Sequence, residues 1–544
     1  MTTKIGTATD YQDLLKILDG FLTTTGHAWG LRFTGTGNGR MRGPGGTTGG
    51  YIGTAASVTE TITITATSAT TFSVVGSISG NLGNATVGTD FASSVVAFRI
   101  VAGSTPFAVG DKFTLNTGPK WSRERLGGVI ENTYRTGTYN NIQNLFDDTA
   151  TAASIVSAST LPQQVQVQMM APTPVRAISI WSSGTAASAP ASFALQWSDD
   201  GSTWNTAQSW TGQTWTATYQ RRDFVLTADP GAHLYWRVNI TATSNANNSA
   251  MSELRMFGDA AMKWDVTTRA EFAWKAPGVD GAQEIFVAGF SNTDPSNDRY
   301  NLAFRGFRFW QDRALSILDI PDHSGSKYTY LAKTPIAYWM IANGGRVIVA
   351  TRISGIYQYV YAGFGLPYET PSVHPFPYLV AGSAVGLALR WDDTTNQLRT
   401  PADPMCNTSS STAGPTNCSL AAMFPSGVFE GIGNRYPSGS SSEGSYSSSQ
   451  PIGSTWPYSW GVNGQTQPFY VRDNIDGSKP LLPVVICFGR QEPRHVWGEF
   501  DGVYYTTGFA QASEAILRDG AIDVMTIQNV FRTTVNAYSA IALD

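Results

Sequence analysis

Short runs of alternating apolar and polar residues recur along most of this 544-residue chain. A period of two places the apolar side chains on one face, which is the pattern of a half-buried β-strand. Four such runs predict a small antiparallel β-unit in residues 51–128; they are residues 60–67, 71–78, 95–101 and 112–116. The recurrence of this pattern predicts a mainly β protein of several β-sandwich or jelly-roll domains with a short N-terminal helix.

Residues 10–23 depart from this pattern and predict that helix. Their apolar residues recur at helical spacing: Tyr11, Leu14, Leu15, Leu18, Phe21 and Leu22. Thr9 and Gln12 stand where a capping box would begin such a helix. We therefore expect residues 1–50 to form the helix and a Gly-rich connector. The connector lacks the Gly-Lys-Ser/Thr sequence of a phosphate loop, so it is interpreted as a plain loop.

Charged residues are scarce, and their scarcity excludes two kinds of partner. They make up 14% of the chain, where about 25% is usual, and the net charge is -4. A nucleic-acid-binding protein needs a basic surface, so we expect no nucleic-acid partner. No apolar run reaches the ~18 residues of a membrane span, and charged residues interrupt the N-terminal segment. We therefore expect neither membrane insertion nor a cleaved signal.

The most specific local pattern lies in residues 129–258. Its strand-like runs surround a tight turn, Asp199-Asp200-Gly201-Ser202. The order of the runs resembles the discoidin family, also called coagulation factor type C or galactose-binding-like domains; the runs are residues 165–169, 175–180, 193–204, 224–226, 235–240 and 252–258. Members of that family are β-sandwiches whose loops at one end bind glycans, lipids or proteins, often beside a structural calcium. The resemblance implies the fold more directly than the ligand.

Aromatic rings stack on sugars while nearby polar groups hold the sugar hydroxyls. Four residues between the expected strands have this character and are the candidate glycan ligands: Trp181, Trp210, Trp215 and Arg221. Packing against the sandwich or against a neighbouring copy is an equally weighted alternative for these tryptophans. Trp204 and Trp236 lie inside the strand motifs and are expected in the core.

The discoidin resemblance also implies a calcium site. Asp148 and Thr151 in the first loop and Glu253 before the last strand would supply the oxygen ligands that calcium prefers. The sequence departs from the family here, because Asp147 and Asp148 replace the usual Asp-Gly and the tryptophan that usually follows is missing. A solvated turn with a surface Glu253 is the alternative interpretation.

Aromatic-rich strand patterns continue through residues 259–544, which are expected to form a second β-rich region. Alternation this dense predicts sheets that are covered on both faces, by another sheet or by another subunit. Residues 402–456 are rich in Ser and Gly and predict a solvent-exposed or partner-ordered loop.

The three cysteines do not form a disulfide framework. Cys406 and Cys418 flank a Ser/Thr/Asn/Pro segment and could pair, or could remain two free thiols. Cys487 lies in an apolar run and is expected in the core.

The sequence gives no pattern typical of an enzyme. The five histidines are scattered, and no His-Glu-x-x-His or Cys-x-x-Cys motif occurs. A glycan depolymerase would need two carboxylates about 5 to 9.5 Å apart. The nearest cluster, Asp294, Asp298, Asp312 and Asp319, has no recognised catalytic spacing and is interpreted as solvated loop residues.

Both ends and the middle of the chain are similar to virion structural proteins of tailed bacteriophages. The similarity rests on the helix at the N-terminus and on residues 271–287, 498–509, 527–533 and 538–543. It implies a virion protein in the tail, baseplate or fibres that assembles with other virion proteins and with copies of itself, as a trimer or a multiple of one. Residues 129–258 would then be an insertion that holds host surface glycan during adsorption. A capsid decoration or head-fibre protein and a host-polysaccharide depolymerase are the alternatives.

Overall fold

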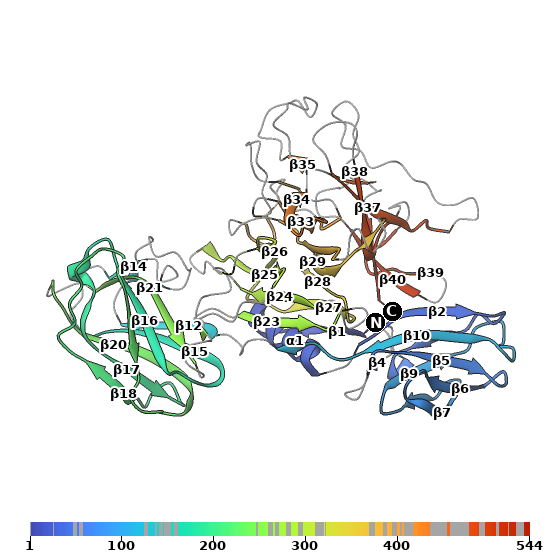
Figure 1. Cartoon of the computed structure of the whole chain (residues 1–544), viewed down its shortest axis with the longest axis horizontal. Helices are drawn as coiled ribbons and strands as arrows, with labels where there is room; N and C mark the ends of the chain where they lie inside the picture. Colours follow the sequence, from blue (N-terminus) through green and yellow to red (C-terminus); the bar gives the residue numbers. More distant parts are fainter. Residues whose placement is uncertain are drawn as a thin grey trace.

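In the part of the chain that the structure describes, antiparallel β-sheets make up most of the regular structure, together with one α-helix, α1 (Tyr11–Thr24) (Figure 1). The computed structural model describes residues 2–24, 27–46, 52–53, 58–123, 129–136, 139–140, 145, 154–156, 161–245, 249–258, 265–266, 271–278, 284–291, 297–309, 320, 322–368, 376–384, 389–393, 400–402, 405–406, 416, 418–432, 434–435, 454–456, 478–488, 495–506, 511–519, 522–528 and 538–543. The predicted mainly β fold with a short N-terminal helix is confirmed. Within these ranges, no helix has the length and apolar character needed to cross a bilayer.

Helix α1 begins one residue later than predicted and has a different cap. Asp10 Oδ1 accepts hydrogen bonds from the N–H groups of Gln12 and Asp13, each at 2.9 Å. Asp13 Oδ2 accepts one from the N–H of Thr9 at 2.8 Å. The predicted capping box of Thr9 and Gln12 is therefore wrong. Aspartates serve here because a carboxylate both accepts the free N–H groups of the first turn and favours the positive end of the helix dipole.

Strands β2 to β10 form an N-terminal β-unit of two packed sheets around one core. One sheet has the order β2-β10-β5-β6-β7, and the other joins β3, β4 and β8 around β9. The bounds are β2 (His27–Thr34), β3 (Arg40–Arg42), β4 (Ile52–Gly53), β5 (Glu60–Ala66), β6 (Thr71–Gly76), β7 (Gly80–Thr86), β8 (Asp90–Ala92), β9 (Val96–Val101) and β10 (Lys112–Gly118). The four predicted strands correspond to β5, β6, β9 and β10. Strand β7 has the sequence GNLGNAT, which lacks apolar alternation, so the sequence does not predict it.

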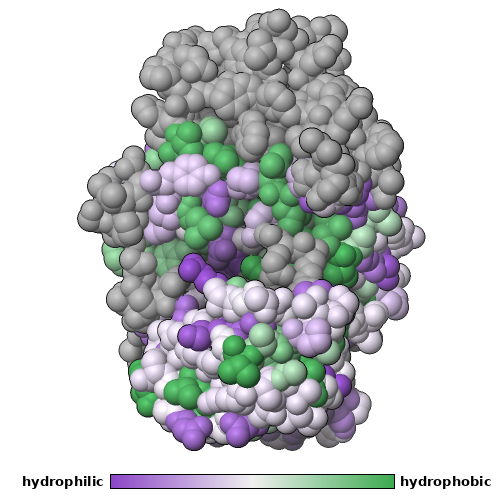
Figure 2. Space-filling model, turned by 90° about the vertical axis from the view of Figure 1, so that its right-hand side faces the viewer, coloured by the Kyte–Doolittle hydropathy of each residue, from purple (hydrophilic) through white to green (hydrophobic). Residues whose placement is uncertain are grey.

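The surface of this unit carries isolated apolar side chains. Ile78 is 70% exposed and Val109 is 76% exposed. Figure 2 shows this end of the molecule, where apolar residues lie among polar ones. Scattered apolar residues are ordinary on protein surfaces, so this face does not indicate a binding site.

A buried histidine makes the stability of this unit depend on pH. His27, at the start of β2, is fully buried. Burial lowers the pKa of His27 from 6.5 to about 3 and outweighs the hydrogen bond with the backbone of Pro119. Below pH 6.5 the unfolded chain takes up a proton that the folded chain does not, so stability falls as the pH drops from 6.5 towards 3.

We expect the unit to lose about 2 kcal/mol of unfolding free energy between pH 7 and pH 5 through His27. A His27→Phe variant keeps an aromatic ring of similar size and should lose correspondingly less. Urea unfolding of both proteins at the two pH values measures the difference. An equal loss in the two proteins would contradict the role of His27.

A central body of three stacked sheets contains most of the remaining chain (Figure 1). The middle sheet has the order β1-β27-β28-β29-β31-β33-β34; the strands are β1 (Thr2–Ala8), β27 (Ile336–Ala342), β28 (Arg346–Ile353), β29 (Ile356–Phe364), β31 (Tyr378–Ala381), β33 (Leu420–Met423) and β34 (Phe429–Ile432). On one side lies the sheet β11-β23-β24-β25-β26; its strands are β11 (Ser122–Arg123), β23 (Glu271–Ala276), β24 (Ile285–Phe290), β25 (Tyr300–Phe307) and β26 (Lys327–Leu331).

On the other side lies the C-terminal sheet, of order β36-β37-β38-β41-β40-β39 with β30 on β38. Its strands are β30 (Leu366–Pro367), β36 (Ser454–Trp456), β37 (Leu482–Phe488), β38 (His495–Thr506), β39 (Ile516–Asp519), β40 (Ile522–Gln528) and β41 (Tyr538–Ala542). A short parallel pair joins β32 (Met405–Cys406) to β35 (Asn434–Arg435).

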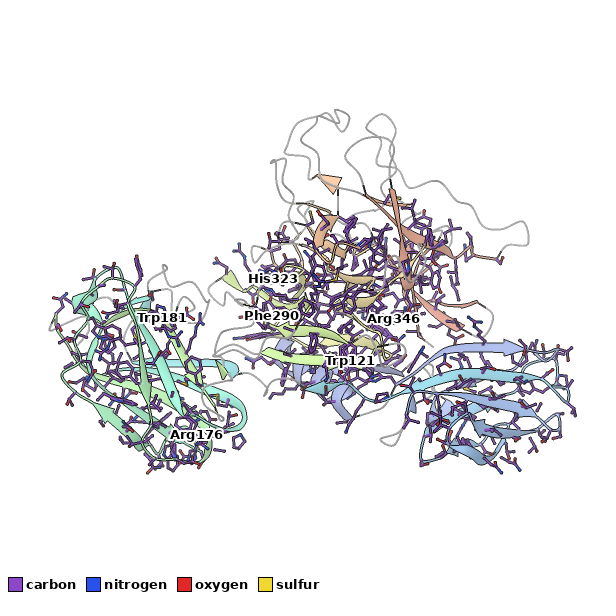
Figure 3. The ribbon with its side chains drawn as sticks, in the orientation of Figure 1. Trp121, Arg176, Trp181, Phe290, His323 and Arg346 are labelled. Atoms are coloured by element: carbon purple, nitrogen blue, oxygen red, sulfur yellow. The ribbon has the colours of Figure 1, made fainter. Side chains whose placement is uncertain are left out.

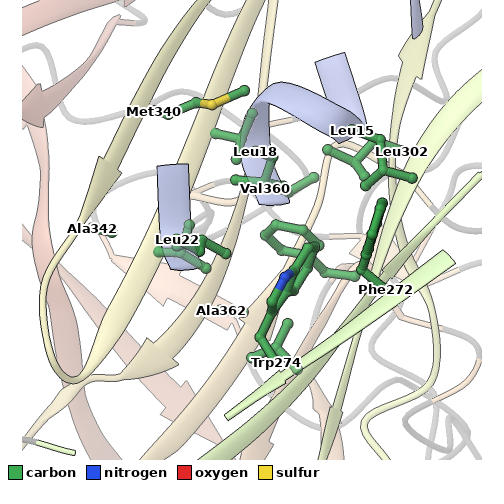
Figure 4. Packing of buried hydrophobic residues seen from close by; sticks show 14 of the residues in the cluster. Leu15, Leu18, Leu22, Phe272, Trp274, Leu302, Met340, Ala342, Val360 and Ala362 are labelled. Atoms are coloured by element: carbon green, nitrogen blue, oxygen red, sulfur yellow. The ribbon is translucent and has the colours of Figure 1, made fainter. Parts of the chain in front are cut away.

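The middle sheet is covered on both faces, as its dense alternation predicts. On β28, Val347 and Val349 belong to the core shared with helix α1 and the β23 to β26 strands, whereas Ile348 and Ala350 belong to the core shared with the C-terminal sheet. Figure 4 shows the first of these cores, where the leucines of α1 pack against Trp274 and its neighbours. The covering elements are other sheets of the same chain and α1.

Strands β33 and β34 lie inside residues 402–456, which the composition predicts to be a loop. Leu420 is fully buried because these strands extend the middle sheet. The most Ser-rich stretch, residues 438–449, lies outside the described residues. Cys418 is disulfide-bonded, Cys487 is a free and buried thiol as predicted, and the side chain of Cys406 lies outside the described residues.

The domain predicted from residues 129–258 is inserted into a sheet of the central body. Strand β11 precedes the insertion and β23 follows it, and the two strands pair: Ser122 lies opposite Lys275 and Arg123 opposite Trp274. Strand β1 pairs with β27, so the first residues also belong to the central body. The central body therefore includes residues before 129 as well as residues after 258. This differs from the predicted ranges 1–50 and 259–544, because strands that pair in a sheet need not be close in sequence.

The inserted domain is a β-sandwich of two antiparallel sheets. The β20 sheet has the order β12-β15-β20-β17-β18; its strands are β12 (Val129–Thr136), β15 (Gln163–Pro174), β17 (Pro190–Ser198), β18 (Asn205–Trp210) and β20 (Ala232–Thr243). The β16 sheet has the order β13-β14-β21-β16-β19 with β22 on β21; its strands are β13 (Tyr139–Asn140), β14 (Ser154–Val156), β16 (Ala177–Ser182), β19 (Arg221–Val225), β21 (Ala250–Phe257) and β22 (Asp265–Val266). Alternate residues of both sheets fill one core.

The predicted tight turn joins β17 and β18. Asp200 Oδ1 accepts hydrogen bonds from the N–H groups of Ser202 at 2.8 Å and Thr203 at 2.7 Å. These donors hold the pKa of the Asp200 carboxyl well below its usual value. Gly201 takes the left-handed φ of 72° that the turn requires.

Candidate functional site

The structure separates the four predicted glycan ligands into two groups. Trp181 and Arg221 lie opposite each other on β16 and β19. Trp210 ends β18, and Trp215 follows in the loop of residues 211–220 that joins β18 to β19. Since β18 and β19 are edge strands of different sheets, this loop closes the open side of the sandwich.

Trp181 lies in the inserted sandwich (Figure 3) and is covered by two arginines. The Cζ atoms of Arg221 and Arg255 each lie 5.0 Å from the centre of its ring. Cation–π contacts of this kind stabilise the ring and the guanidinium groups together. The side chain is 8% exposed, so little of the ring is left for a ligand.

Carboxylates accompany both arginines. Arg221 Nε lies 2.8 Å from Asp223 Oδ1, and Arg255 Nε lies 3.4 Å from Glu253 Oε1. The group around Trp181 is therefore balanced in charge. This arrangement favours the packing alternative for Trp181 and Arg221 over direct contact with a glycan.

Glu253 is the one predicted calcium ligand that the structure describes. It is 1% exposed and its carboxylate faces the guanidinium of Arg255. A cation beside the carboxylate does not fit a calcium site, and no cluster of three or more His, Cys, Asp or Glu that could hold a metal occurs in the described ranges. Asp148 and Thr151 lie outside those ranges.

Thermal unfolding with and without a chelator tests the calcium hypothesis. An unchanged thermal midpoint would contradict it.

Trp215 is fixed in a half-buried position. Its Nε1 donates a hydrogen bond to the carbonyl oxygen of Pro190 at 2.8 Å. The Arg222 Cζ lies 5.4 Å from the ring centre. Arg222 in turn donates to the Thr214 carbonyl at 2.9 Å and to Gln213 Oε1 at 2.8 Å. An aromatic ring, a guanidinium and an amide are thus held side by side.

Hydrogen bonds hold the 211–220 loop in place. The N–H of Gln213 donates to the Ala191 carbonyl at 2.8 Å, and the N–H of Ser182 donates to the Gln220 carbonyl at 3.0 Å. The side-chain Oε1 of Gln220 accepts from the N–H of Thr216 at 2.8 Å. A loop fixed in this way loses little conformational entropy when it binds a ligand.

Trp210 lies between the 211–220 loop and the core of the sandwich. Its ring centre lies 5.3 Å from that of Phe193 and 5.5 Å from that of Phe224. The ring packs against the core of the sandwich and is half-buried. Trp210 therefore stabilises the surface on which the 211–220 loop lies. Trp215 also packs against this core, with its ring centre 6.4 Å from that of Phe224, but it is the predicted ligand that stands in a loop.

The sequence reasoning misassigned one of two remaining tryptophans. Trp236 is in the core, fully buried, and donates a hydrogen bond to the Thr173 carbonyl at 3.1 Å. Trp204 is half-buried outside the core, where Arg237 Cζ lies 4.0 Å from its ring centre. The core prediction for Trp204 is wrong because Trp204 precedes β18 and does not share its alternation.

The acidic residues considered for catalysis are mostly outside the described part of the chain. Asp294, Asp312 and Asp319 lie there, and Asp298 pairs with Arg390 at 3.4 Å.

No family model and no curated protein matches the chain. Solved structures with similar folds include CpGH89CBM32-5 from Clostridium perfringens, in complex with GalNAc-β-1,3-galactose, with 12% identity, coverage of 23% of this chain and 94% of that chain, and a TM-score of 0.21. A pectin-binding carbohydrate-binding module has 18% identity, coverage of 25% and 94%, and a TM-score of 0.21. An F5/8 type C domain from Bacteroides fragilis has 10% identity, coverage of 24% and 95%, and a TM-score of 0.20. The inserted domain has the two-sheet β-sandwich fold that the discoidin resemblance implies.

Proposed function

We propose that the chain is a structural scaffold whose inserted sandwich binds glycan through the 211–220 loop. The observation that carries this proposal is the fixed group of Trp215, Arg222 and Gln213. An indole offers an apolar face to a sugar ring, while amide and guanidinium groups donate to its hydroxyls. Tyr219, which is 39% exposed, adds a second aromatic ring to the same loop.

Replacing Trp215 by alanine should weaken glycan binding about tenfold, because it removes the ring that would contact the sugar. Binding of the full chain to an array of bacterial surface glycans, followed by titration of the best ligand, measures the effect. Val225→Ala is the matched control, since Val225 lies on β19 and is 55% exposed. Equal affinities for Trp215→Ala and the parent protein would contradict the proposed site.

We further propose that this scaffold is a component of a tailed-phage virion, in the tail, baseplate or fibres. The sequence resemblance at both ends and in the middle of the chain supports it. A second support is the position of the sandwich, which leaves and rejoins the central body at the paired strands β11 and β23. Such an insertion extends a glycan-binding module without interrupting the sheet that carries it, and many copies on one particle would act together.

Immunogold electron microscopy of intact virions with antibody against residues 129–258 tests this setting. Label at the tail tip or fibres would support the adsorption role. Label on the head would instead support the decoration or head-fibre alternative, and absence of label from intact particles would contradict a virion role. Light scattering on particle-derived protein would test the expected trimer or multiple.

A further inference from the structure

Four strands of the β20 sheet, β15, β17, β18 and β20, present amides on their outer face where exposed strands often present charges. Among β15, β17, β18 and β20, Arg237 is the single Lys, Arg, Asp or Glu. The residues that alternate with the core positions on these strands include Gln164, Gln166, Gln168, Gln196, Tyr235, Arg237 and Asn239. This face can therefore form many hydrogen bonds with a polar ligand while carrying little charge of its own.

Arg237 is held at the centre of this face by neutral groups. Its Nε donates to Gln196 Oε1 at 2.7 Å, and its Nη1 donates to Gln164 Oε1 at 3.1 Å. No carboxylate of the described residues forms an ion pair with it. Among the described residues no carboxylate offsets the positive charge of this guanidinium, and its planar shape suits a carboxylate.

The amides around Arg237 are fixed by further hydrogen bonds. Gln164 Nε2 donates to Asn239 Oδ1 at 3.2 Å, and Gln196 Nε2 donates to Thr206 Oγ1 at 3.0 Å. The network runs across four neighbouring strands, which lie roughly 4.8 Å apart in any sheet. Because each member is already oriented, a ligand would bind without ordering these side chains.

The ring of Trp204 lies against Arg237 of this network. Arg237 Cζ is 4.0 Å from its ring centre, so the guanidinium fixes the indole against the sheet. The side chain is half-buried, which leaves part of the ring accessible. An indole fixed on one side by a cation and accessible elsewhere is suited to stacking on a sugar ring.

We propose that Trp204, Arg237, Gln196 and Gln164 form a second glycan-binding surface, for a polysaccharide that carries uronate carboxylates. Trp204 stacks on a sugar ring, the amides bind hydroxyl groups, and Arg237 binds the carboxylate. The uncompensated charge of Arg237 is what favours an acidic polysaccharide over a neutral one. This surface is independent of the 211–220 loop, which lies at the open side of the sandwich.

Affinity electrophoresis of the full chain in gels containing polygalacturonate, or neutral galactan, tests the proposal. We expect polygalacturonate to retard the protein and galactan to retard it far less. Trp204→Ala and Arg237→Gln should each weaken binding to polygalacturonate about tenfold. Trp204→Phe should retain most of the affinity. Added salt should weaken binding of the parent protein to polygalacturonate, because salt screens the contact between Arg237 and the carboxylate.

Trp215→Ala separates this proposal from the function proposed for the loop. Unchanged retardation of Trp215→Ala together with loss in Trp204→Ala would support the second surface. Loss in Trp215→Ala with no effect of Trp204→Ala and Arg237→Gln would overturn it while leaving the loop site intact. Equal retardation of Trp215→Ala by galactan and by polygalacturonate would also overturn it, because that variant lacks the loop site. Thermal midpoints of all variants check that each is folded. Arg237→Lys, which keeps the charge but loses the paired donors, should give intermediate retardation by polygalacturonate.

Discussion

Replacing Trp274 by alanine is expected to lower the unfolding free energy of the central body by about 3–5 kcal/mol. Trp274 lies on β23 and is fully buried between α1 and the sheets (Figure 4). Its ring fills the space beside Gly289, where a Cβ would come within 2.6 Å of the indole. Its Nε1 donates a hydrogen bond to Asp19 Oδ1 at 2.9 Å, so the residue also joins the helix to the sheet.

Urea unfolding followed by far-ultraviolet circular dichroism measures this loss. Trp204→Ala is the matched control, because Trp204 lies outside the cores and its removal should change stability by about 0.5 kcal/mol or less. The loss of unfolding free energy in Trp274→Phe should lie between the losses in Trp274→Ala and Trp204→Ala, since phenylalanine keeps part of the ring but loses the hydrogen bond. A midpoint for Trp274→Ala equal to that of Trp204→Ala would show that the helix does not depend on this contact.

Removing the Asp523 carboxylate is expected to detach the N-terminal β-unit from the central body at a cost of about 3–5 kcal/mol. Asp523 lies on β40 and is 1% exposed. Its Oδ1 lies 3.3 Å from Arg40 Nη1, and its Oδ2 pairs with Arg42 of the same strand, β3. Arg42 is buried, so its charge would remain without this partner in an Asp523→Ala variant. The contribution of Arg40 is smaller because its side chain is 36% exposed.

Limited proteolysis and small-angle scattering would detect the detached unit as a faster cleavage and a larger radius of gyration. The double variant Arg42→Met/Asp523→Leu should recover much of the loss, because replacing both members of a buried pair by apolar residues removes the uncompensated charge. If Asp523→Ala were as compact and as resistant as the parent protein, the ion pairs would not be what holds the two parts together.

The regular elements of the fold were largely predictable because they depend on neighbours along the chain. The predicted strand 60–67 is β5, the predicted strand 112–116 is β10, and the helix boundary differs by one residue at each end. Apolar periodicity encodes these elements directly. The pairings of β1 with β27 and of β11 with β23 were not predictable, since strands far apart in the sequence carry no local signal of their partners.

The candidate site likewise combines features that were predictable from the sequence with features that were not. The sequence by itself determined that residues 129–258 alternate as a sandwich, that Asp200 and Gly201 turn the chain, and that Trp215 stands in a loop, because each of these follows from residue types within a few positions. The tertiary structure decided the environment of each tryptophan: Trp181 lies under two arginines, whereas Trp204 lies on an open face against one. Alternation specifies the side of a sheet on which a residue lies, but what covers that side depends on residues that are remote in the sequence.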